Sequence, residues 1–381
     1  MEILLALVLV VFTTWVIAKA CDGFEVAADH LGRNMTDGVK GATINAIGSS
    51  MPELFVTFVF LFMYADTTGF AGGIGTTAGS AVFNTMVIPA LSILVALKMF
   101  RLSSINVSKK VILRDGLMLI AAEFILIVTI GEKLEWWHGM MLMLLYVGYA
   151  GYMLFSMRKN TGEEANDNED DEEEEDGDEI KSNRAVSFFK LDLEHAIIGK
   201  NKFTNGNSWL LLVISTLFIA IACYFLVEGA ELFASQIGIA SYFVAVIIVA
   251  AASSVPDTIL SVKDAKKGNY DDAVSNALGS NIFDICFALG LPLFLYAVIY
   301  GPVYIPADIA SDIVELRLLL LFLTIGAFLI FFFGHGMGKK KAYGLLAMYS
   351  FFTIFIIARA YEMPWVEPIA NSLHVIQQYL S

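Results

Sequence analysis

GSSMPE at residues 48–53 and ASSVPD at residues 252–257 are two versions of one hexapeptide, one in each half of the 381-residue chain. A second pair of boxes follows them in the same order, GSAVFN at 79–84 and GSNIFD at 279–284. Two different motifs that recur in order and at nearly equal spacing indicate an internal repeat. We therefore predict that the chain is built from two structurally related halves.

The composition places these halves in a bilayer. Hydrophobic residues make up 57% of the chain and the mean hydropathy is +0.69. Apolar windows long enough to cross a membrane predict about ten helices. They fall near residues 3–21, 39–64, 70–97, 113–131, 137–157, 208–227, 239–262, 271–299, 315–334 and 342–361. We expect an all-α integral membrane protein whose surroundings are lipid.

Basic residues predict the orientation. They gather after the third span (98–114), after the seventh (263–267) and after the ninth (339–341), so these loops should be cytoplasmic. Both termini are then extracytoplasmic. Because each half has an odd number of spans, the halves enter the membrane from opposite sides, which is the inverted-repeat architecture of secondary transporters. A plasma membrane or cell inner membrane is the expected location.

Most of the formal net charge of −14 comes from a single segment. Residues 163–179 hold thirteen Asp and Glu and no Lys or Arg. Such a run repels itself and has no apolar pattern, so it predicts a cytoplasmic linker that is at least partly disordered. The predicted organisation is a first repeat at 1–157, the acidic linker at 158–207, a second repeat at 208–361 and a C-terminal tail at 362–381.

The first box of each half combines a helix break with a carboxylate. Proline has no N–H to donate, so Pro52 frees the carbonyl of Gly48 and Pro256 frees that of Ala252. A freed carbonyl in hydrocarbon is costly unless something binds it, and a desolvated cation would do so. Glu53 and Asp257 follow the prolines directly, with serines four residues earlier on the same helical face.

The second box supplies side-chain pairs at i and i+4, Ser80 with Asn84 and Ser280 with Asp284, while Gly79 and Gly279 should allow close helix approach. All donors are oxygens, without His or Cys, which favours Na+, K+ or Ca2+ over Zn2+ or Cu2+. The candidate cation ligands are Glu53, Asp257, Asp284, Asn84, Ser49, Ser50, Ser80, Ser253, Ser254, Ser280, Gly48 and Ala252.

The carboxylates carry more weight than the small residues. Ser, Gly and Pro occur in membrane helices for packing alone, whereas an ionised group at mid-span is expensive and usually marks an ion path. Asp22, Glu25, Glu228 and Glu231 lie nearer the span ends, so they could line a mouth or extend to the membrane surface.

The four boxes resemble the alpha repeats of the cation/calcium exchanger superfamily, most closely its potassium-dependent sodium/calcium exchangers. That branch reads like GSSxPE with GSAVFN in the first repeat and SVPD with GSNxFDI in the second. The resemblance, over roughly 20–100 and 222–300, implies ten helices, alternating access by sliding of the first and sixth spans, and shared Na+ and Ca2+ sites around Glu53 and Asp257. It also implies that four Na+ exchange for one Ca2+ and one K+.

Charge counting from the residues points the same way, because Glu53, Asp257 and Asp284 sum to −3, which Ca2+ with K+ would neutralise. The alternative is that Asp284 stays protonated and acts only as a hydrogen-bonding ligand. A potassium-independent or proton-coupled calcium exchanger and a cation channel are the competing functions. No nucleotide-binding motif, cofactor site or nucleic-acid-binding pattern is evident, so we expect a transporter of small cations, not an enzyme, with no obligate protein partner.

Overall fold

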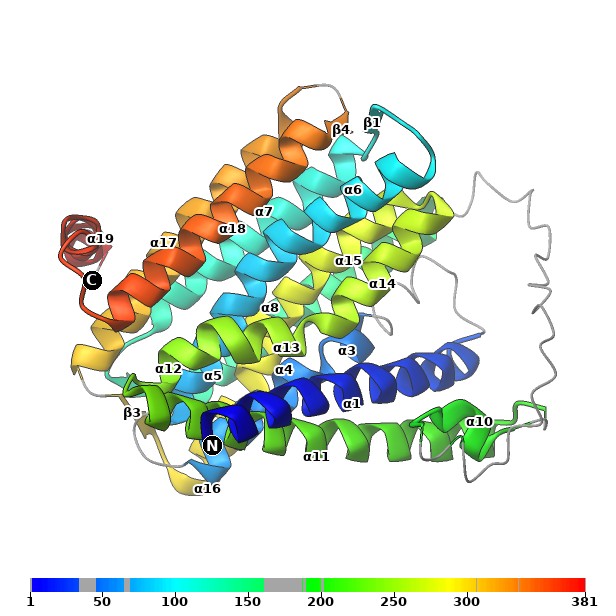
Figure 1. Cartoon of the computed structure of the whole chain (residues 1–381), viewed down its shortest axis with the longest axis horizontal. Coiled ribbons are helices and arrows are strands. Elements are labelled where there is room, and N and C mark those ends of the chain that lie inside the picture. The colour runs from blue at the N-terminus through cyan, green and yellow to red at the C-terminus, as the bar shows by residue number, and fades with distance from the viewer. Residues whose placement is uncertain are drawn as a thin grey trace.

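The computed structural model describes residues 2–33, 46–64, 69–160, 187, 190–199, 202–305, 307–334 and 336–380. The acid-rich part of the predicted linker, 163–179, lies outside these residues. Helices dominate the described chain (Figure 1). In the first half they are α1 (Glu2–Leu31), α3 (Ala46–Ser49), α4 (Met51–Met63), α5 (Gly69–Val82), the π-helical turn η2 (Phe83–Val87), α6 (Ile88–Met99), α7 (Lys109–Thr129) and α8 (Trp136–Asn160).

The second half follows the same plan. A short helix, α10 (Leu193–Ile197), precedes it. The second half itself contains α11 (Asn205–Ile237), α12 (Ser241–Val244), the π-helical turn η3 (Ala245–Val249), α13 (Ala250–Ser253), α14 (Val255–Lys267), α15 (Tyr270–Phe283), the π-helical turn η4 (Asp284–Ala288), α16 (Gly290–Tyr300), α17 (Ala307–Phe332) and α18 (Lys339–Ala360).

Within the described residues, each predicted span coincides with a helix or with a broken run of helices. Residues 39–45 of the second predicted window lie outside them. By length and composition, six spans in the described part of the chain are apolar enough to cross a membrane, and the pair Ser241–Ser253 and Val255–Lys267, bent by 41°, makes a seventh. The helices α4, α7 and α8 coincide with the other predicted windows. Helix α4 is short, and α7 contains the buried charges Asp115 and Glu123.

The helices occupy two kinds of position. The segment Gly69–Met99 is central, with 78% of its apolar window buried, whereas α1 and α11 are peripheral, with 33% and 39% buried. Helices α1 and α11 lie side by side at an angle to the diagonal bundle (Figure 1). Their outer faces expose large apolar side chains such as Val8 and Ile221, as expected for a surface that contacts lipid tails.

Two short strand pairs tie loops together at opposite ends of the bundle. Strand β1 (Ser104–Ile105) pairs antiparallel with β4 (Met337–Gly338), and β2 (Lys133–Leu134) pairs with β3 (Val303–Tyr304). The first pair joins two loops that we predicted to be cytoplasmic. The second joins the loops that follow the fourth and eighth predicted spans, which the same orientation puts on the other side of the membrane. The loops therefore group as the charge pattern predicts.

The C-terminal segment, expected only as a tail, contains α19 (Glu367–Leu380). It packs against α17, and His374 contacts Ser311 and the buried Glu315 there. The sequence analysis did not predict this helix.

Candidate cation site

Both proline boxes interrupt a helix and place a carboxylate in the first turn of the helix that follows. Helix α3 ends at Ser49 and α4 begins at Met51, so Glu53 lies in the first turn of α4. Helix α13 ends at Ser253 and α14 begins at Val255, so Asp257 lies in the first turn of α14. A carboxylate at this position is stabilised by the positive end of the helix dipole.

Each proline removes the helical donor of one carbonyl. Neither Pro52 nor Pro256 can donate to the carbonyl four residues before it, which belongs to Gly48 in the first box and to Ala252 in the second. The backbone N–H of Ser254, which caps α13, donates to the carbonyl of Ala250 at 3.1 Å.

The second boxes coincide with π-helical turns, which the sequence analysis did not predict. Asn84 lies in η2 and Asp284 begins η4, at equivalent positions of the two repeats. A π-turn inserts one extra residue into a helix and often marks a functional site. Asn84 donates to Asp257, in the first turn after the break of the second repeat, and Asp284 accepts from Ser80 of α5.

All three carboxylates are fully buried, and hydroxyls join them. The Ser80 hydroxyl lies 3.3 Å from Glu53 Oε1 and 3.1 Å from Asp284 Oδ2, so it bridges the two repeats. Ser254 lies 2.9 Å from Ser80 and 3.4 Å from Glu53 Oε1. Asp257 accepts from Ser280 at 2.8 Å and from the Asn84 amide at 3.1 Å.

The motifs thus complete one another across the repeats. Asn84 and Ser80, which the spacing pairs, do interact, at 3.3 Å, but each also reaches a carboxylate of the second repeat. Asp284 of the second repeat accepts from Ser80 of the first, whereas Ser280 donates to Asp257 within the second repeat. The pattern within one repeat predicts none of these partners across the repeats.

Several buried oxygens of the network have no hydrogen-bond partner among the described residues. They are Glu53 Oε2, Asp284 Oδ1, Asn84 Oδ1 and the hydroxyl of Ser50. No three or more Asp, Glu, His and Cys side chains within the described ranges are grouped closely enough to hold a metal ion. Serine and asparagine side chains contact the carboxylates, and the unpartnered oxygens could bind a dehydrated cation.

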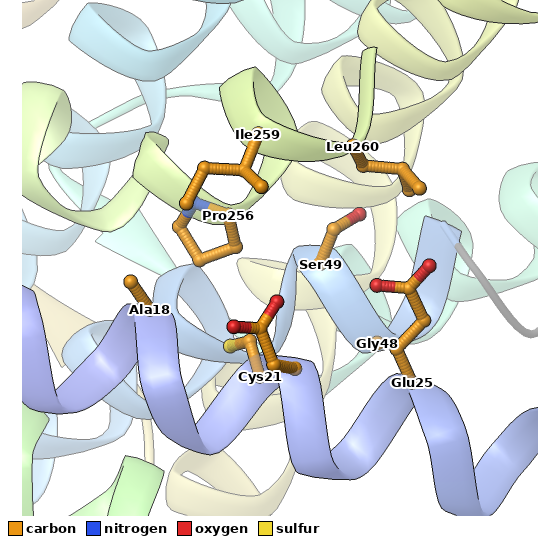
Figure 2. Close-up of a pocket in the computed structure, with 9 residues that line it drawn as sticks. Ala18, Cys21, Glu25, Gly48, Ser49, Pro256, Ile259 and Leu260 are labelled. Carbon is orange, nitrogen blue, oxygen red and sulfur yellow. The ribbon is translucent and has the colours of Figure 1, made fainter. Parts of the chain in front are cut away.

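The remaining predicted residues surround this network. Ser253 is buried and bonds to the carbonyl of Ala250 at 3.2 Å. Ser49 and Gly48 line a cavity of about 20 Å³, with Pro256 opposite. Figure 2 shows Cys21 and Glu25 on α1, which borders the same cavity on the side away from Pro256.

The acidic residues near the span ends have different roles in the two halves. Asp22 and Glu25 line the cavity and also a larger open pocket of about 660 Å³ beside it. Asp22 also pairs with Lys263 at 3.4 Å. Of their counterparts in the second half, Glu228 accepts from Tyr64 at 2.7 Å and from Tyr224 at 3.2 Å, and Glu231 accepts from Ser241. The cavity beside Asp22 and Glu25 thus reaches Gly48 and Ser49, which directly precede the break before Glu53.

One glycine prediction holds and one is wrong. A Cβ on Gly79 would collide with the backbone carbonyl of Val246 in η3, so α5 approaches the second repeat closely there. A Cβ on Gly279 would meet only the Tyr149 hydroxyl, at 4.0 Å, which is an ordinary contact. Gly279 does not mediate a close helix approach.

Asn281 and Thr85 also belong to this network, although the sequence motifs did not single them out. The Asn281 amide donates to Thr85 at 2.8 Å and to the carbonyl of Ala81 at 3.1 Å, which ties α15 to the helix that carries Ser80 and Asn84. The signal was present, since Asn281 is a polar residue within GSNIFD where the first repeat has Ala81.

A family model described as "Sodium/calcium exchanger protein" matches the chain twice, at residues 4–155 and at 207–358. The two matches cover the two predicted repeats and exclude the acidic linker.

Similar curated proteins include sodium/potassium/calcium exchangers. Exchanger 4 of Mus musculus is 32% identical over 166 residues, which are 42% of this chain and 25% of the mouse protein. The chain therefore spans about a quarter of that relative. Exchanger 5 of Homo sapiens is 25% identical over 95% of this chain and 84% of its own length. The membrane protein MJ0091 of Methanocaldococcus jannaschii is 25% identical over 72% of this chain and 77% of its own length.

Solved structures share the fold. The H+/Ca2+ exchanger CAX superposes with a TM-score of 0.61 at 12% identity, covering 100% of this chain and 91% of its own. The sodium-calcium exchanger NCX_Mj superposes with a TM-score of 0.53 at 22% identity, covering 94% of this chain and 98% of its own. At these identities the similarity identifies the architecture alone.

Proposed function

Because the chain belongs to the sodium/calcium exchanger protein family, we propose that it is a secondary active antiporter that exchanges Na+ for Ca2+ across a membrane. The observation that carries the proposal is the network of Glu53, Asp257 and Asp284. They are fully buried, come from both repeats and interleave with hydroxyls. Buried carboxylates with unpartnered oxygens suit a hard cation that has lost its water.

Alternating access would then move α1 and α11 against the rest of the bundle. Support comes from their peripheral position and from the asymmetry of their acidic residues. The cavity beside Ser49 opens where Asp22 and Glu25 lie, while Glu228 is held by Tyr64 and Tyr224. On the predicted orientation, this arrangement is the inward-facing state.

Potassium is proposed as the companion of Ca2+. A site with three carboxylates carries −3 when all are ionised, and Ca2+ alone leaves −1 in a low-dielectric environment, where imbalance is expensive. Asn84, at the position equivalent to Asp284, adds no fourth charge. We therefore assign K+ to the neighbourhood of Asp284.

The test is Ca2+ uptake into proteoliposomes with the Na+, K+ and pH gradients set independently. Uptake driven by an outward Na+ gradient and stimulated by K+ supports the whole proposal. Uptake driven by Na+ without any effect of K+ leaves a sodium/calcium exchanger. Uptake driven only by a pH gradient identifies a proton-coupled exchanger, and Ca2+ flux that needs no cation on the other side identifies a channel.

A further inference from the structure

Arg317 of α17 is a fully buried guanidinium in the core of the bundle. It pairs with Glu123 of α7, also fully buried, with 2.9 Å between Arg317 Nη1 and Glu123 Oε1. Replacing a buried ion pair by apolar side chains is often neutral or stabilising, so stability alone does not explain such a pair. Ionisable residues inside a membrane usually mark function.

The second terminal nitrogen of Arg317 contacts α5. Arg317 Nη2 donates to Thr77 Oγ1 at 2.6 Å and to the carbonyl of Ile74 at 3.0 Å. Thr77 lies three residues before Ser80, so the two side chains share one face of α5. Ser80 is the hydroxyl that bridges Glu53 and Asp284. Arg317 therefore holds α5 one helical turn from the centre of the cation network.

We propose that Arg317 is a positioning residue for the cation site, and that Glu123 neutralises it so that its charge does not repel the cation. This inference rests on the proposed function, because it concerns the same site. Arg317 sets the rotation and height of α5 through Thr77, and so places the Ser80 hydroxyl between the two carboxylates.

The neutralising role of Glu123 predicts that its loss weakens the binding of a divalent cation more than that of a monovalent cation. The guanidinium touches Thr77, and residues three apart on a helix are about 5–6 Å apart, so its charge lies on the order of 10 Å from a cation at Ser80. Without Glu123, an effective dielectric constant of about 20 predicts a repulsion that weakens binding about tenfold for a monovalent ion and about a hundredfold for a divalent ion. A purely structural disturbance would weaken the binding of both ions by similar factors.

The first experiment compares Thr77→Val with Thr76→Val. Both threonines are fully buried on α5, but the Thr76 hydroxyl donates to Gly72 in its own helix, whereas Thr77 accepts from Arg317. We expect Thr77→Val to raise the apparent KM for Ca2+ several-fold at a nearly unchanged maximal rate, and Thr76→Val to behave like the wild type. Equal behaviour of the two variants would refute the positioning role.

The second experiment measures Na+ and Ca2+ affinity separately from transport, through the cation-dependent rise in unfolding temperature of the purified protein. Glu123→Gln should weaken Ca2+ binding by about the square of the factor for Na+. Equal factors for the two ions would overturn the neutralising role.

A double variant, Glu123→Leu with Arg317→Met, serves if the single variant does not fold. It removes both charges, so the ratio of Ca2+ to Na+ affinity should stay at the wild-type value. Because it also removes the contact of Arg317 with Thr77, its affinity for both ions should fall as it does in Thr77→Val. A ratio that changes in the double variant would contradict the inference. Because binding is measured directly, a wild type that binds cations without exchanging them would refute only the proposed function.

Discussion

Replacing Asp284 by Asn tests the proposed potassium site. Glu53 Oε1 and Asp284 Oδ2 both contact the Ser80 hydroxyl, at 3.3 and 3.1 Å. The two oxygens are therefore no more than about 6.4 Å apart, and at an effective dielectric constant of about 20 two unit charges at that separation repel by about 3 kcal/mol. A site loaded with Ca2+ alone keeps −1, so a repulsion of this size persists in the state that must cross the membrane, and a K+ that offsets it can raise the rate of Ca2+ exchange by up to about a hundredfold. In Asp284→Asn the Ca2+-loaded site is neutral, so K+ has nothing to offset.

The assay is Na+-driven Ca2+ uptake into proteoliposomes, with external K+ varied at constant ionic strength and clamped membrane potential. In the wild type, K+ should raise the rate of Ca2+ uptake, and Asp284→Asn should transport Ca2+ equally well with and without K+. Glu315→Gln is the matched control, because Glu315 is also buried but contacts Arg359 and His374, and it should keep the K+ dependence. A wild type indifferent to K+ at every concentration would refute the charge-counting argument, as expected if Asp284 is protonated.

Three further predictions concern the same network and the linker. Glu53→Gln and Asp257→Asn should each abolish Ca2+ transport while the protein remains folded, because each removes one of few anionic ligands at a cost of several kcal/mol. The unfolding temperature is the folding control, and near-normal exchange in both variants would show that the site is misplaced. Ser80→Ala should raise the apparent KM for Ca2+ more than Ser280→Ala does. Ser80 contacts two carboxylates and Asn84, whereas Ser280 donates one hydrogen bond to Asp257, and a hydrogen bond to a charged group contributes about 1.5–3 kcal/mol. Equal effects of the two substitutions would contradict this ranking. Deleting 163–179 should leave exchange largely intact in uptake assays, and complete loss of transport in a well-folded deletion would count against the linker interpretation.

The repeat and the membrane location could be predicted from the sequence because they depend on local properties. Hydropathy over about 20 residues is enough to indicate a span. A proline next to an acid is enough to indicate a break that carries a carboxylate, as at Glu53 and Asp257. The family comparison matches both halves independently of that reasoning.

Local sequence patterns were thus enough to predict the two related halves, the spans and three buried carboxylates, Glu53, Asp257 and Asp284, but not the buried Asp115 and Glu123. Which groups meet depends on how the helices pack: Ser80 with Asp284, Asn84 with Asp257, and Arg317 with Thr77. Such contacts depend on the rotation and height of one helix against another. A π-helical turn at Asn84 or Asp284 changes that rotation without a clear local signal. Ser80 and Ser280 are equivalent in the repeat pattern. The packing of the two halves nevertheless places Ser80 between Glu53 and Asp284, carboxylates of both repeats, and pairs Ser280 with Asp257 of its own repeat.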